Sequence, residues 1–299
     1  MFTTELEAAL RSGRVDLAVH SAKDLPAEMA GDLTIAAVPP RADARDVLVT
    51  RGGLSLAALP RGAVVGTSSR RRGMQILHAR PDVALASIRG NVDTRLRKVL
   101  GEKFATEFTE NSESSEKRER EEKEMSGDAT RDAQPLSSFS ESSEFSVNSV
   151  AKTDSFDAAV LAMAGLVRVG FDVVCAKYLS PLSLEQCIPA AGQGALAVQA
   201  AVGNSRACSL AARLDDADSR AALEAERAVV ASLGGDCHSC IAVYVRCVGG
   251  AVWEILFLAA KPDFSSPYRT RVTGPSAMAV AVTLMEQLRR DRVDEIVAG

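Results

Sequence analysis

The sequence predicts an α/β protein with more than one domain. Short apolar runs alternate with helical patterns, as in "AVVG" (63–66) before "SRRRGMQILHAR" (69–80) and "ALASI" (84–88) before "VDTRLRKVL" (92–100). Strands that alternate with helices in this way are typical of parallel βαβ units. The 299 residues, 46% of them hydrophobic, are enough to build the cores of two or three domains.

The chain is predicted to begin with a helix and two strands. Thr4 and Glu7 have the spacing of a capping box, an apolar stripe follows them, and Gly13 can end the helix. The two strands are expected at "VDLAVH" (15–20) and "LTIAAVPP" (33–40).

The polar stretch "RADARD" (41–46) is interpreted as a connection to the strand–helix units described above. Periodicity and turn residues then predict a strand at 157–162, a helix at 164–170, a Pro/Gly turn and strand within 188–200, a helix at about 217–233 ending at Gly234 and Gly235, a hairpin around Gly249 and Gly250, and a closing helix at 276–297. The last three features form a further, smaller α/β unit.

Residues 101–155 interrupt the alternation. The segment is dominated by Ser, Glu, Lys and Arg and contains the charge run "EKREREEKE". Its apolar content is too low to offset the entropy of ordering, so we interpret it as a disordered insert. A surface loop absorbs such an insertion at modest thermodynamic cost.

Charge and composition argue against several classes of protein. With a formal net charge of −4 the chain is not expected to bind nucleic acid, because such proteins need a basic excess to neutralise phosphates. No run approaches the roughly 18 apolar residues that span a bilayer, and the first residues lack a signal-peptide pattern, so a cytoplasmic protein without membrane contact is expected. The six cysteines are spread over a long chain, so reduced thiols are expected.

Cationic and hydroxyl residues follow several of the predicted strands, where open parallel sheets bind their ligands. They are Thr67, Ser68, Ser69, Arg70, Arg71 and Arg72 after the first strand, Arg89, Gly90, Asn91 and Arg95 after the second, and Arg168 after the third. On an acidic chain, this pattern predicts a ligand with several carboxylates or phosphates held by arginine pairs. The alternative is that these arginines are solvated helix residues.

The first part of the chain offers the opposite charge. Lys23 and Asp24 follow the strand "VDLAVH" directly, and Pro26 prevents further strand pairing. A carboxylate that faces an arginine-lined cleft suits proton transfer or the stabilisation of a developing cation. The alternative is a turn aspartate that caps its own backbone. His20 is interpreted as a packed residue at the strand end, because no ligand spacing surrounds it.

The stretch "SLGGDCHSCIAVYV" (232–245) places Cys237 and Cys240 at C-x-x-C spacing. A structural zinc site needs about four ligands, and no second cysteine or histidine pair has suitable spacing, so no metal is expected. Redox pairs usually lie at a helix N-terminus, whereas this pair follows a helix end. A thiol redox or metal function is therefore a minor hypothesis.

The chain resembles the porphobilinogen deaminase (hydroxymethylbilane synthase) family. The resemblance lies in "FTTELEAALRSGRVDLAVHSAKDLP", "GTSSRRR", "SIRGNVDTRLRK", "DAAVLAMAGLVRVG", "IPAAGQGALAVQ" and "AERAVVASLGGDC". Together with the spacing between them, these stretches cover nearly the whole chain outside the insert, and they occur in this order.

The resemblance implies three domains. The first two are similar to type II periplasmic binding proteins, with mixed, mainly parallel sheets, and the third is a small α/β domain with an antiparallel sheet. The implied boundaries are 1–40 with 195–214 for the first domain, 45–188 with the insert for the second, and 217–299 for the third.

The resemblance also implies an activity. A dipyrromethane cofactor is bound through a thioether to a cysteine, four porphobilinogen units are added head to tail with loss of ammonia, and hydrolysis releases hydroxymethylbilane for porphyrin and haem biosynthesis. Uroporphyrinogen-III synthase acts next in the pathway, and a monomer is expected. The alternative is a non-catalytic remnant of the same fold that binds anions or tetrapyrrole precursors.

The roles of individual residues are implied by their positions in the family motifs. Asp24 is the catalytic carboxylate and Cys237 the attachment site. The residues expected to bind cofactor and substrate are Ser21, Lys23, Thr67, Ser68, Ser69, Arg71, Arg72, Arg89, Gly90, Asn91, Arg95, Arg168 and Gln193. Arg70 is left out, since the family often has an apolar residue there.

The chain departs from the family pattern at four positions. Cys240 stands where a proline is usual, and Arg70 replaces the apolar residue. The family has an N-terminal strand, helix, strand and mobile loop before the point where this chain begins. The chain as written is therefore expected to be truncated and poorly stable or inactive, and the missing segment could carry a plastid transit sequence. The insert at 101–155 replaces a short turn.

Overall fold

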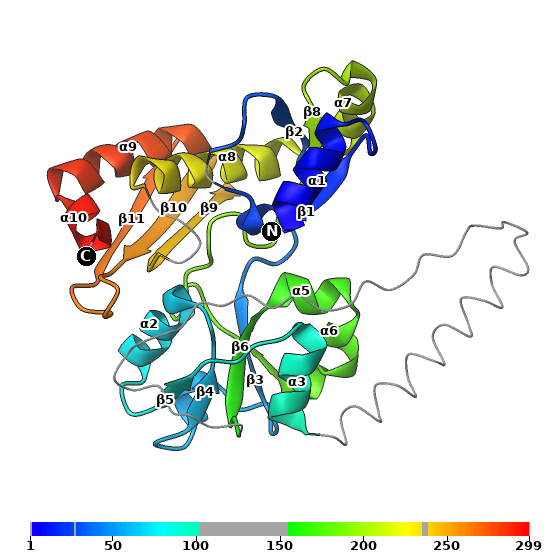
Figure 1. The fold of residues 1–299 in the computed structure, drawn as a ribbon. Helices are drawn as coiled ribbons and strands as arrows, with labels where there is room; N and C mark the ends of the chain where they lie inside the picture. Colours follow the sequence, from blue (N-terminus) through cyan, green and yellow to red (C-terminus); the bar gives the residue numbers. More distant parts are fainter. Residues whose placement is uncertain (1, 27, 102–154, 235–238, 299) are drawn as a thin grey trace, which may run out of the picture.

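The computed structural model describes residues 2–26, 28–101, 155–234 and 239–298. Strands in these residues form three sheets, each with its own helices (Figure 1). We name them the β8 sheet, the β6 sheet and the β10 sheet after one strand of each. The expected insert, apart from its ends, and Cys237 lie outside the described residues.

The β8 sheet has the strand order β1-β8-β2. Its strands are β1 (Ala18–Ser21), β8 (Leu196–Ala201) and β2 (Leu33–Ala37), and the helices beside them are α1 (Phe2–Arg11) and α7 (Ser205–Ala211). Leu10 of α1 packs on Ala18 and Leu33, which confirms the predicted first helix. The short helical turn η1 (Ala22–Asp24) follows β1 directly.

The β6 sheet has the strand order β5-β4-β6-β3-β7. Its strands are β3 (Asp46–Thr50), β4 (Val64–Gly66), β5 (Ala84–Ala86), β6 (Ala158–Ala162) and β7 (Leu179–Pro181), and its helices are α2 (Arg70–Ala79), α3 (Val92–Leu100), α5 (Met163–Arg168) and α6 (Phe171–Val174). Leu48 packs toward α2, whereas its neighbours Val47 and Val49 pack toward α3 and α5. Helices therefore cover both faces of this sheet.

The β10 sheet is an antiparallel meander with the order β11-β10-β9. Its strands are β9 (Ile241–Gly249), β10 (Val252–Ala259) and β11 (Tyr268–Gly274), and its helices are α8 (Ala217–Ser232), α9 (Ala277–Arg290) and α10 (Val293–Ala298). The predicted hairpin is confirmed, since β9 ends at Gly249 and pairs with β10. Ile255 and Phe257 of β10 pack against Val229 of α8 and Leu284 of α9 in a single core.

Two of the sequence predictions are wrong. The first two sheets are not mainly parallel. β8 runs antiparallel to both β1 and β2, and β3 runs antiparallel to both β6 and β7. Among the described strands, the parallel pairs are those of β4 with β5 and with β6. The reason is that β3 and β8 belong to chain segments that cross from one sheet to another, outside the local strand–helix units. The closing helix is also broken in two, because Arg292 adopts a positive φ of 55°.

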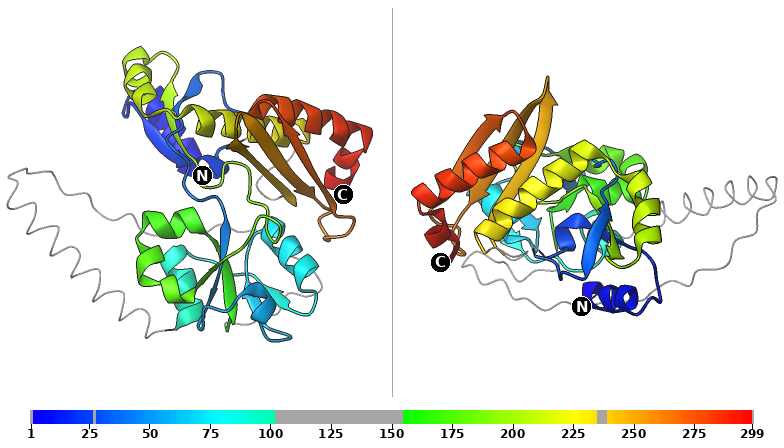
Figure 2. Two further views of the ribbon diagram at one scale, coloured as in Figure 1. Left: turned by 180° about the vertical axis from the view of Figure 1, so that it is seen from behind. Right: turned by 90° about the horizontal axis from the view of Figure 1, so that it is seen from above.

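Two chain segments join the β6 sheet to the rest of the protein. Residues 38–45 lead from β2 to β3, and residues 182–195 lead from β7 to β8. The β8 and β10 sheets lie side by side above the β6 sheet in Figure 1 and in the left view of Figure 2. The β10 sheet also contacts the β6 sheet unit, since Met74 and Ile188 pack with Ala242 and Leu256. Within the described ranges, we find no helix long and apolar enough to cross a membrane.

Candidate functional site

The first group of the candidate site lies on η1. Lys23 is half-buried and Asp24 is exposed. The pKa of Lys23 is lowered to about 8, mainly by burial and also by the charges of Arg72 and Arg71, against the opposing effects of Asp24 and Asp46. Lys23 is therefore within electrostatic range of α2, which belongs to another sheet.

The loop before α2 is shaped by its own hydroxyl groups. Thr67 is buried, and its Oγ1 accepts a hydrogen bond from the Ser69 amide at 3.2 Å. Ser69 is the N-cap of α2 and accepts from the Arg72 amide at 3.4 Å. Ser68 Oγ donates to the Ile88 carbonyl at 2.8 Å. These contacts fix the start of the helix that carries Arg71 and Arg72.

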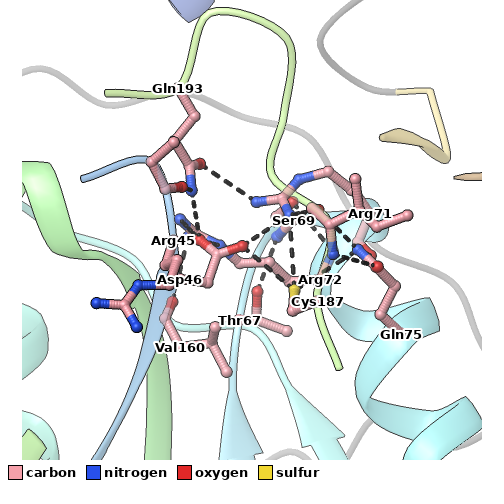
Figure 3. Close-up of polar contacts among 12 residues, drawn as sticks. Arg45, Asp46, Thr67, Ser69, Arg71, Arg72, Gln75, Val160, Cys187 and Gln193 are labelled. Atoms are coloured by element: carbon pink, nitrogen blue, oxygen red, sulfur yellow. Dashed lines mark hydrogen bonds and ion pairs between the residues drawn. The ribbon is translucent and has the colours of Figure 1, made fainter. Parts of the chain in front are cut away.

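Asp46, the first residue of β3, is the centre of a buried polar cluster (Figure 3). Its Oδ2 accepts from Arg71 Nη1 at 2.7 Å and from the Cys187 thiol at 3.2 Å. Its Oδ1 accepts from Arg72 Nε at 2.9 Å and from Gln193 Nε2 at 2.8 Å. We name Asp46, Arg71, Arg72, Cys187 and Gln193 the Asp46 cluster.

The charges of this cluster are strongly coupled. Burial alone would raise the pKa of Asp46, but the charges of Arg71 and Arg72 and the hydrogen bonds from Arg71 and Gln193 hold it well below its ordinary value. For Arg71, burial opposes ionisation, but Asp46 raises its pKa above the ordinary value. Burial raises the pKa of the Cys187 thiol, and Asp46 adds to this effect. Asp46 is thus ionised at neutral pH, and Cys187 is a neutral thiol.

The arginines of the cluster are also anchored to the main chain. Arg71 Nη1 donates to the Ile188 carbonyl at 2.6 Å, and Arg72 Nη1 donates to the Val160 carbonyl at 3.1 Å. A guanidinium carries five N–H donors in a fixed fork. An anion that approaches the cluster would meet donors whose directions are already fixed.

Gln193 lies in the turn between the two glycines of "AAGQGA". Its side chain is 1% exposed, accepts from Arg71 Nη2 at 3.3 Å and donates to the Ala44 carbonyl at 2.7 Å. Gly194 has a φ of +86°, and a Cβ there would lie 2.5 Å from the Ala42 carbonyl oxygen. The two crossing segments are therefore packed directly on each other at this turn. In the structure Gln193 joins these segments, and its side chain is buried.

A second buried carboxylate lies on the other side of the same turn. Glu226 of α8 is 0% exposed and accepts from Arg41 Nη1 at 2.7 Å. The amides of Gly192 and Val245 also donate to it, at 2.6 and 2.8 Å. Arg41 in turn donates through Nε to the Gln193 carbonyl at 2.8 Å. We name Glu226, Arg41 and the Gly192 and Val245 amides the Glu226 cluster.

The remaining arginines approach the site from two helices of the β6 sheet. Arg95 Nε donates to the Gly90 carbonyl at 2.7 Å, and its pKa is lowered by burial and by the charge of Arg72. Arg168 Nη2 donates to the Gly194 carbonyl at 2.7 Å, and burial lowers its pKa. Asn91 is the N-cap of α3 and accepts from the Thr94 amide at 2.9 Å.

The structure brings together only part of the predicted set of site residues. Arg71 and Arg72 act electrostatically on Lys23, Arg72 also acts on Arg95, and Arg168 donates to the Gly194 carbonyl in the adjacent turn. Other predicted residues have a structural contact or an exposed position: Ser21 pairs with β8, Ser69 and Asn91 cap helices, Ser68 bonds a carbonyl, Gly90 accepts from Arg95, and Arg89 is exposed.

Sequence reasoning missed Arg41, Asp46 and Glu226. "RADARD" was interpreted as a polar connection, yet it supplies both Arg41 and Asp46 to buried clusters. A charged residue directly before the apolar run "VLVT" was the available signal for Asp46. Glu226 interrupts the apolar stripe of α8 between Ala222 and Val229, which was the signal for a buried carboxylate.

The C-x-x-C hypothesis is not favoured by the described half of the motif. Cys240 is 4% exposed and packs with Met74 and Ile188 in an apolar cluster. Burial raises the pKa of its thiol to about 11, whereas reactive redox thiols have a lowered pKa. Among the described residues, no group of three or more metal-ligating side chains comes together.

Comparisons with known proteins agree on one family. A family model described as "Porphobilinogen deaminase, dipyromethane cofactor binding domain" matches residues 1–109 and 146–209. A protein named porphobilinogen deaminase from Roseiflexus castenholzii is 42% identical over 238 residues, covering 80% of this chain and 60% of that protein. Proteins of the same name from Sorangium cellulosum and Geobacillus kaustophilus are 38% and 35% identical, covering 89% and 99% of this chain and 70% and 79% of their own lengths.

Proposed function

Because the chain belongs to the porphobilinogen deaminase family, we propose that it is a hydroxymethylbilane synthase. The proposed reaction joins four porphobilinogen molecules head to tail, with loss of one ammonia at each addition, and releases hydroxymethylbilane for tetrapyrrole biosynthesis. The chain spans 60% of the length of the Roseiflexus relative.

The observation that carries this proposal is the convergence of cations from two sheets. Arg71 and Arg72 of the β6 sheet unit act electrostatically on Lys23 of the β8 sheet unit, and Arg72 also acts on Arg95. Like charges repel, so such a group is useful when an anion with several negative charges binds between them. Every pyrrole unit of the substrate carries an acetate and a propionate, which match this need.

The donor set also fits the dipyrromethane cofactor that the family model names. Two pyrrole rings carry four carboxylates, and arginine forks bind carboxylates in a bidentate geometry. Lys23, Arg71, Arg72, Arg95 and Arg168 would hold these acid arms, and Cys237 would supply the thioether. When bound, the cofactor supplies the primer to which substrate units are joined.

Asp24 is the proposed catalytic carboxylate. It lies at the end of η1, next to Lys23, and its charge acts on that lysine. In this position it would accept hydrogen bonds from pyrrole N–H groups and stabilise the cation left when ammonia departs. Its exposed position suits contact with a ligand, whereas Asp46 and Glu226 are closed off from solvent.

We also propose that the three sheets are the cores of three domains with boundaries 1–40 with 195–214, 45–188 and 217–299. Largely separate apolar clusters and the two crossing segments support this division, in which the first two domains would be similar to type II periplasmic binding proteins. A monomer that passes its product to uroporphyrinogen-III synthase, in the cytoplasm or in a plastid, completes the proposal.

The proposal is tested by the covalent adduct. The purified chain incubated with porphobilinogen should gain the mass of two pyrrole units and give the dipyrromethane colour with Ehrlich's reagent. Both signals should be lost in Cys237→Ser and kept in Cys208→Ser, a control cysteine on α7 outside the site. Absence of an adduct in a folded chain that still binds porphobilinogen would favour the non-catalytic binding remnant.

A further inference from the structure

We propose that Asp46 is the positioning residue of the ligand site: its carboxylate holds Arg71 and Arg72 in one fixed arrangement and offsets part of their charge on Lys23. This inference rests on the proposed function for its ligand, but its contacts belong to the chain itself. Asp46 has no exposed surface, so it would act on a ligand through its neighbours.

The geometry of α2 shows why a positioning residue is needed. Arg71 and Arg72 are consecutive on a helix, so their side chains leave the axis about 100° apart. Both nevertheless reach the same carboxylate, Arg71 at Oδ2 and Arg72 at Oδ1. Two adjacent guanidiniums would repel each other if no anion lay between them. Asp46 provides that anion from a different element, β3.

The remaining partners of Asp46 fix its own orientation. Gln193 Nε2 donates to Oδ1, and the Cys187 thiol donates to Oδ2. Gln75 holds the segment beside Cys187, because its Oε1 accepts from the Ile188 amide at 2.7 Å. Each oxygen of the carboxylate therefore has two partners or more, and the group is completely buried. A carboxylate held in this way has one orientation available.

The charge balance connects the cluster to Lys23. The ionisable groups that act on Lys23 are Arg71 and Arg72 of α2, Asp24 of η1 and Asp46 of β3. The two arginines disfavour its protonated form, and the two aspartates favour it. With Asp46 present the three cations are partly offset, and Lys23 is mostly protonated at neutral pH, since its pKa is about 8. A neutral residue at position 46 would remove this offset.

Two variants separate the geometric role from the charge. Asp46→Asn removes the charge and turns one acceptor into a donor that faces an arginine. Gln193→Met removes one partner of Asp46 and one of Arg71 but changes no charge. Asp43→Asn is the matched control. Asp43 lies only three residues before Asp46 in the sequence, but it is an exposed carboxylate that pairs with Arg45.

The first readout does not need activity. The rate of amine labelling of Lys23 is followed against pH by mass spectrometry of its peptide, in chains shown to be folded by circular dichroism. The wild-type midpoint is expected near pH 8 and should move down in Asp46→Asn, because the loss of one negative charge disfavours the protonated amine. Gln193→Met and Asp43→Asn should keep the wild-type midpoint.

The second readout is turnover of porphobilinogen by the holoenzyme. kcat/KM should fall about 100-fold in Asp46→Asn and less in Gln193→Met, because misplaced donors bind the acid arms poorly. The Asp43→Asn control should stay within about twofold of wild type. The pH at which kcat/KM falls on the alkaline side should follow the Lys23 midpoint in each variant.

The results distinguish this inference from the proposed function. A folded Asp46→Asn chain that matches Asp43→Asn in both readouts would overturn the inference. If Asp46→Asn does not fold, a Gln193→Met chain with wild-type kcat/KM would also overturn it. If even wild type has no turnover, the proposed function fails, and the labelling midpoints of folded Asp46→Asn and wild type still decide the role of Asp46.

Discussion

Asp46 and Glu226, two carboxylates with no exposed surface, lie on opposite sides of one turn and differ in their partners. Asp46 faces two guanidiniums, Arg71 and Arg72, so its cluster has a surplus positive charge. Glu226 faces one guanidinium, that of Arg41, and two main-chain amides, so its cluster is neutral. Gln193 touches both clusters, through its side chain on one side and its carbonyl on the other.

The difference shows what each cluster can do. A buried ion pair with balanced charge and full hydrogen bonding has little attraction left for a ligand, so the Glu226 cluster acts by joining α8, β9 and the two crossing segments. The surplus charge of the Asp46 cluster, together with Lys23 and Arg95, favours an anion. A buried pair of carboxylate and arginine therefore joins chain segments in the Glu226 cluster, whereas in the Asp46 cluster it prepares a binding site for an anion.

The largest expected effect on stability comes from neutralising Glu226. Glu226→Gln leaves the buried Arg41 without its counter-charge and places an amide N–H against donors, which should lower the free energy of unfolding by about 3 kcal/mol. Urea denaturation followed by circular dichroism measures this loss. The control is Glu224→Gln on the same helix, whose carboxylate is 56% exposed and pairs with Arg220 at 3.5 Å.

The control should change the free energy of unfolding by less than about 0.5 kcal/mol, as is usual for exposed ion pairs. Equal losses in the two variants would contradict the structural role of the Glu226 cluster. A loss confined to Glu226→Gln would sharpen the contrast with the Asp46 cluster.

An intermediate effect is expected at the turn that separates the clusters. Gly194→Ala places a Cβ at positive φ and 2.5 Å from the Ala42 carbonyl oxygen, whereas Gly62→Ala has a similar φ of +75° but open space around the new atom. Positive φ alone costs an alanine roughly 1 kcal/mol. Gly194→Ala should therefore lower the free energy of unfolding by more than Gly62→Ala, by about 1 to 2 kcal/mol.

Urea denaturation of the two alanine variants measures this difference. If both lose the same amount, the crossing segments are not held by close packing at Gly194. The contacts of Gln193 would then have to be the main link between the two clusters.

The sequence predicted the local elements better than the way in which they pair. Repeating strand–helix patterns identified β4, α2, β5 and α3 close to their observed bounds, because local hydrophobic periodicity determines them. β3 and β11 were not predicted. β3 begins at a charged residue, and in β11 the exposed residues Arg269, Arg271 and Thr273 alternate with half-buried ones. Strand direction depends on contacts between distant segments, which periodicity does not contain.

The candidate site shows the same division. Arg71, Arg72 and Lys23 were predicted because they follow strands, and ligand sites in α/β sheets lie there. The carboxylates that organise the clusters were missed, since Asp46 and Arg71 are 25 residues apart and Arg41 and Glu226 are 185 apart. A buried ion pair between such distant positions leaves no local pattern beyond a charged residue in an apolar surrounding.

The smallest expected effect concerns the start of α2. Ser69 accepts from the Arg72 amide at the long distance of 3.4 Å, and the same first turn is also held by Asp46 through Arg71 and Arg72. Ser69→Ala should therefore lower the free energy of unfolding by less than about 0.5 kcal/mol, at the lower limit for an N-cap. Asn91→Ala removes a cap that accepts at 2.9 Å from Thr94 and should cost about 1 kcal/mol.

Urea denaturation of both cap variants makes the comparison, with Ser276→Ala at the start of α9 as a control cap outside the site. Its loss should be close to that of Asn91→Ala, since α9 has an ordinary side-chain cap. If Ser69→Ala loses as much as Asn91→Ala, the first turn of α2 depends on its cap and not on Asp46. A near-zero loss in Ser69→Ala alone would show that the buried carboxylate holds this helix start, because Asp46 is the anchor that remains when the hydroxyl is removed.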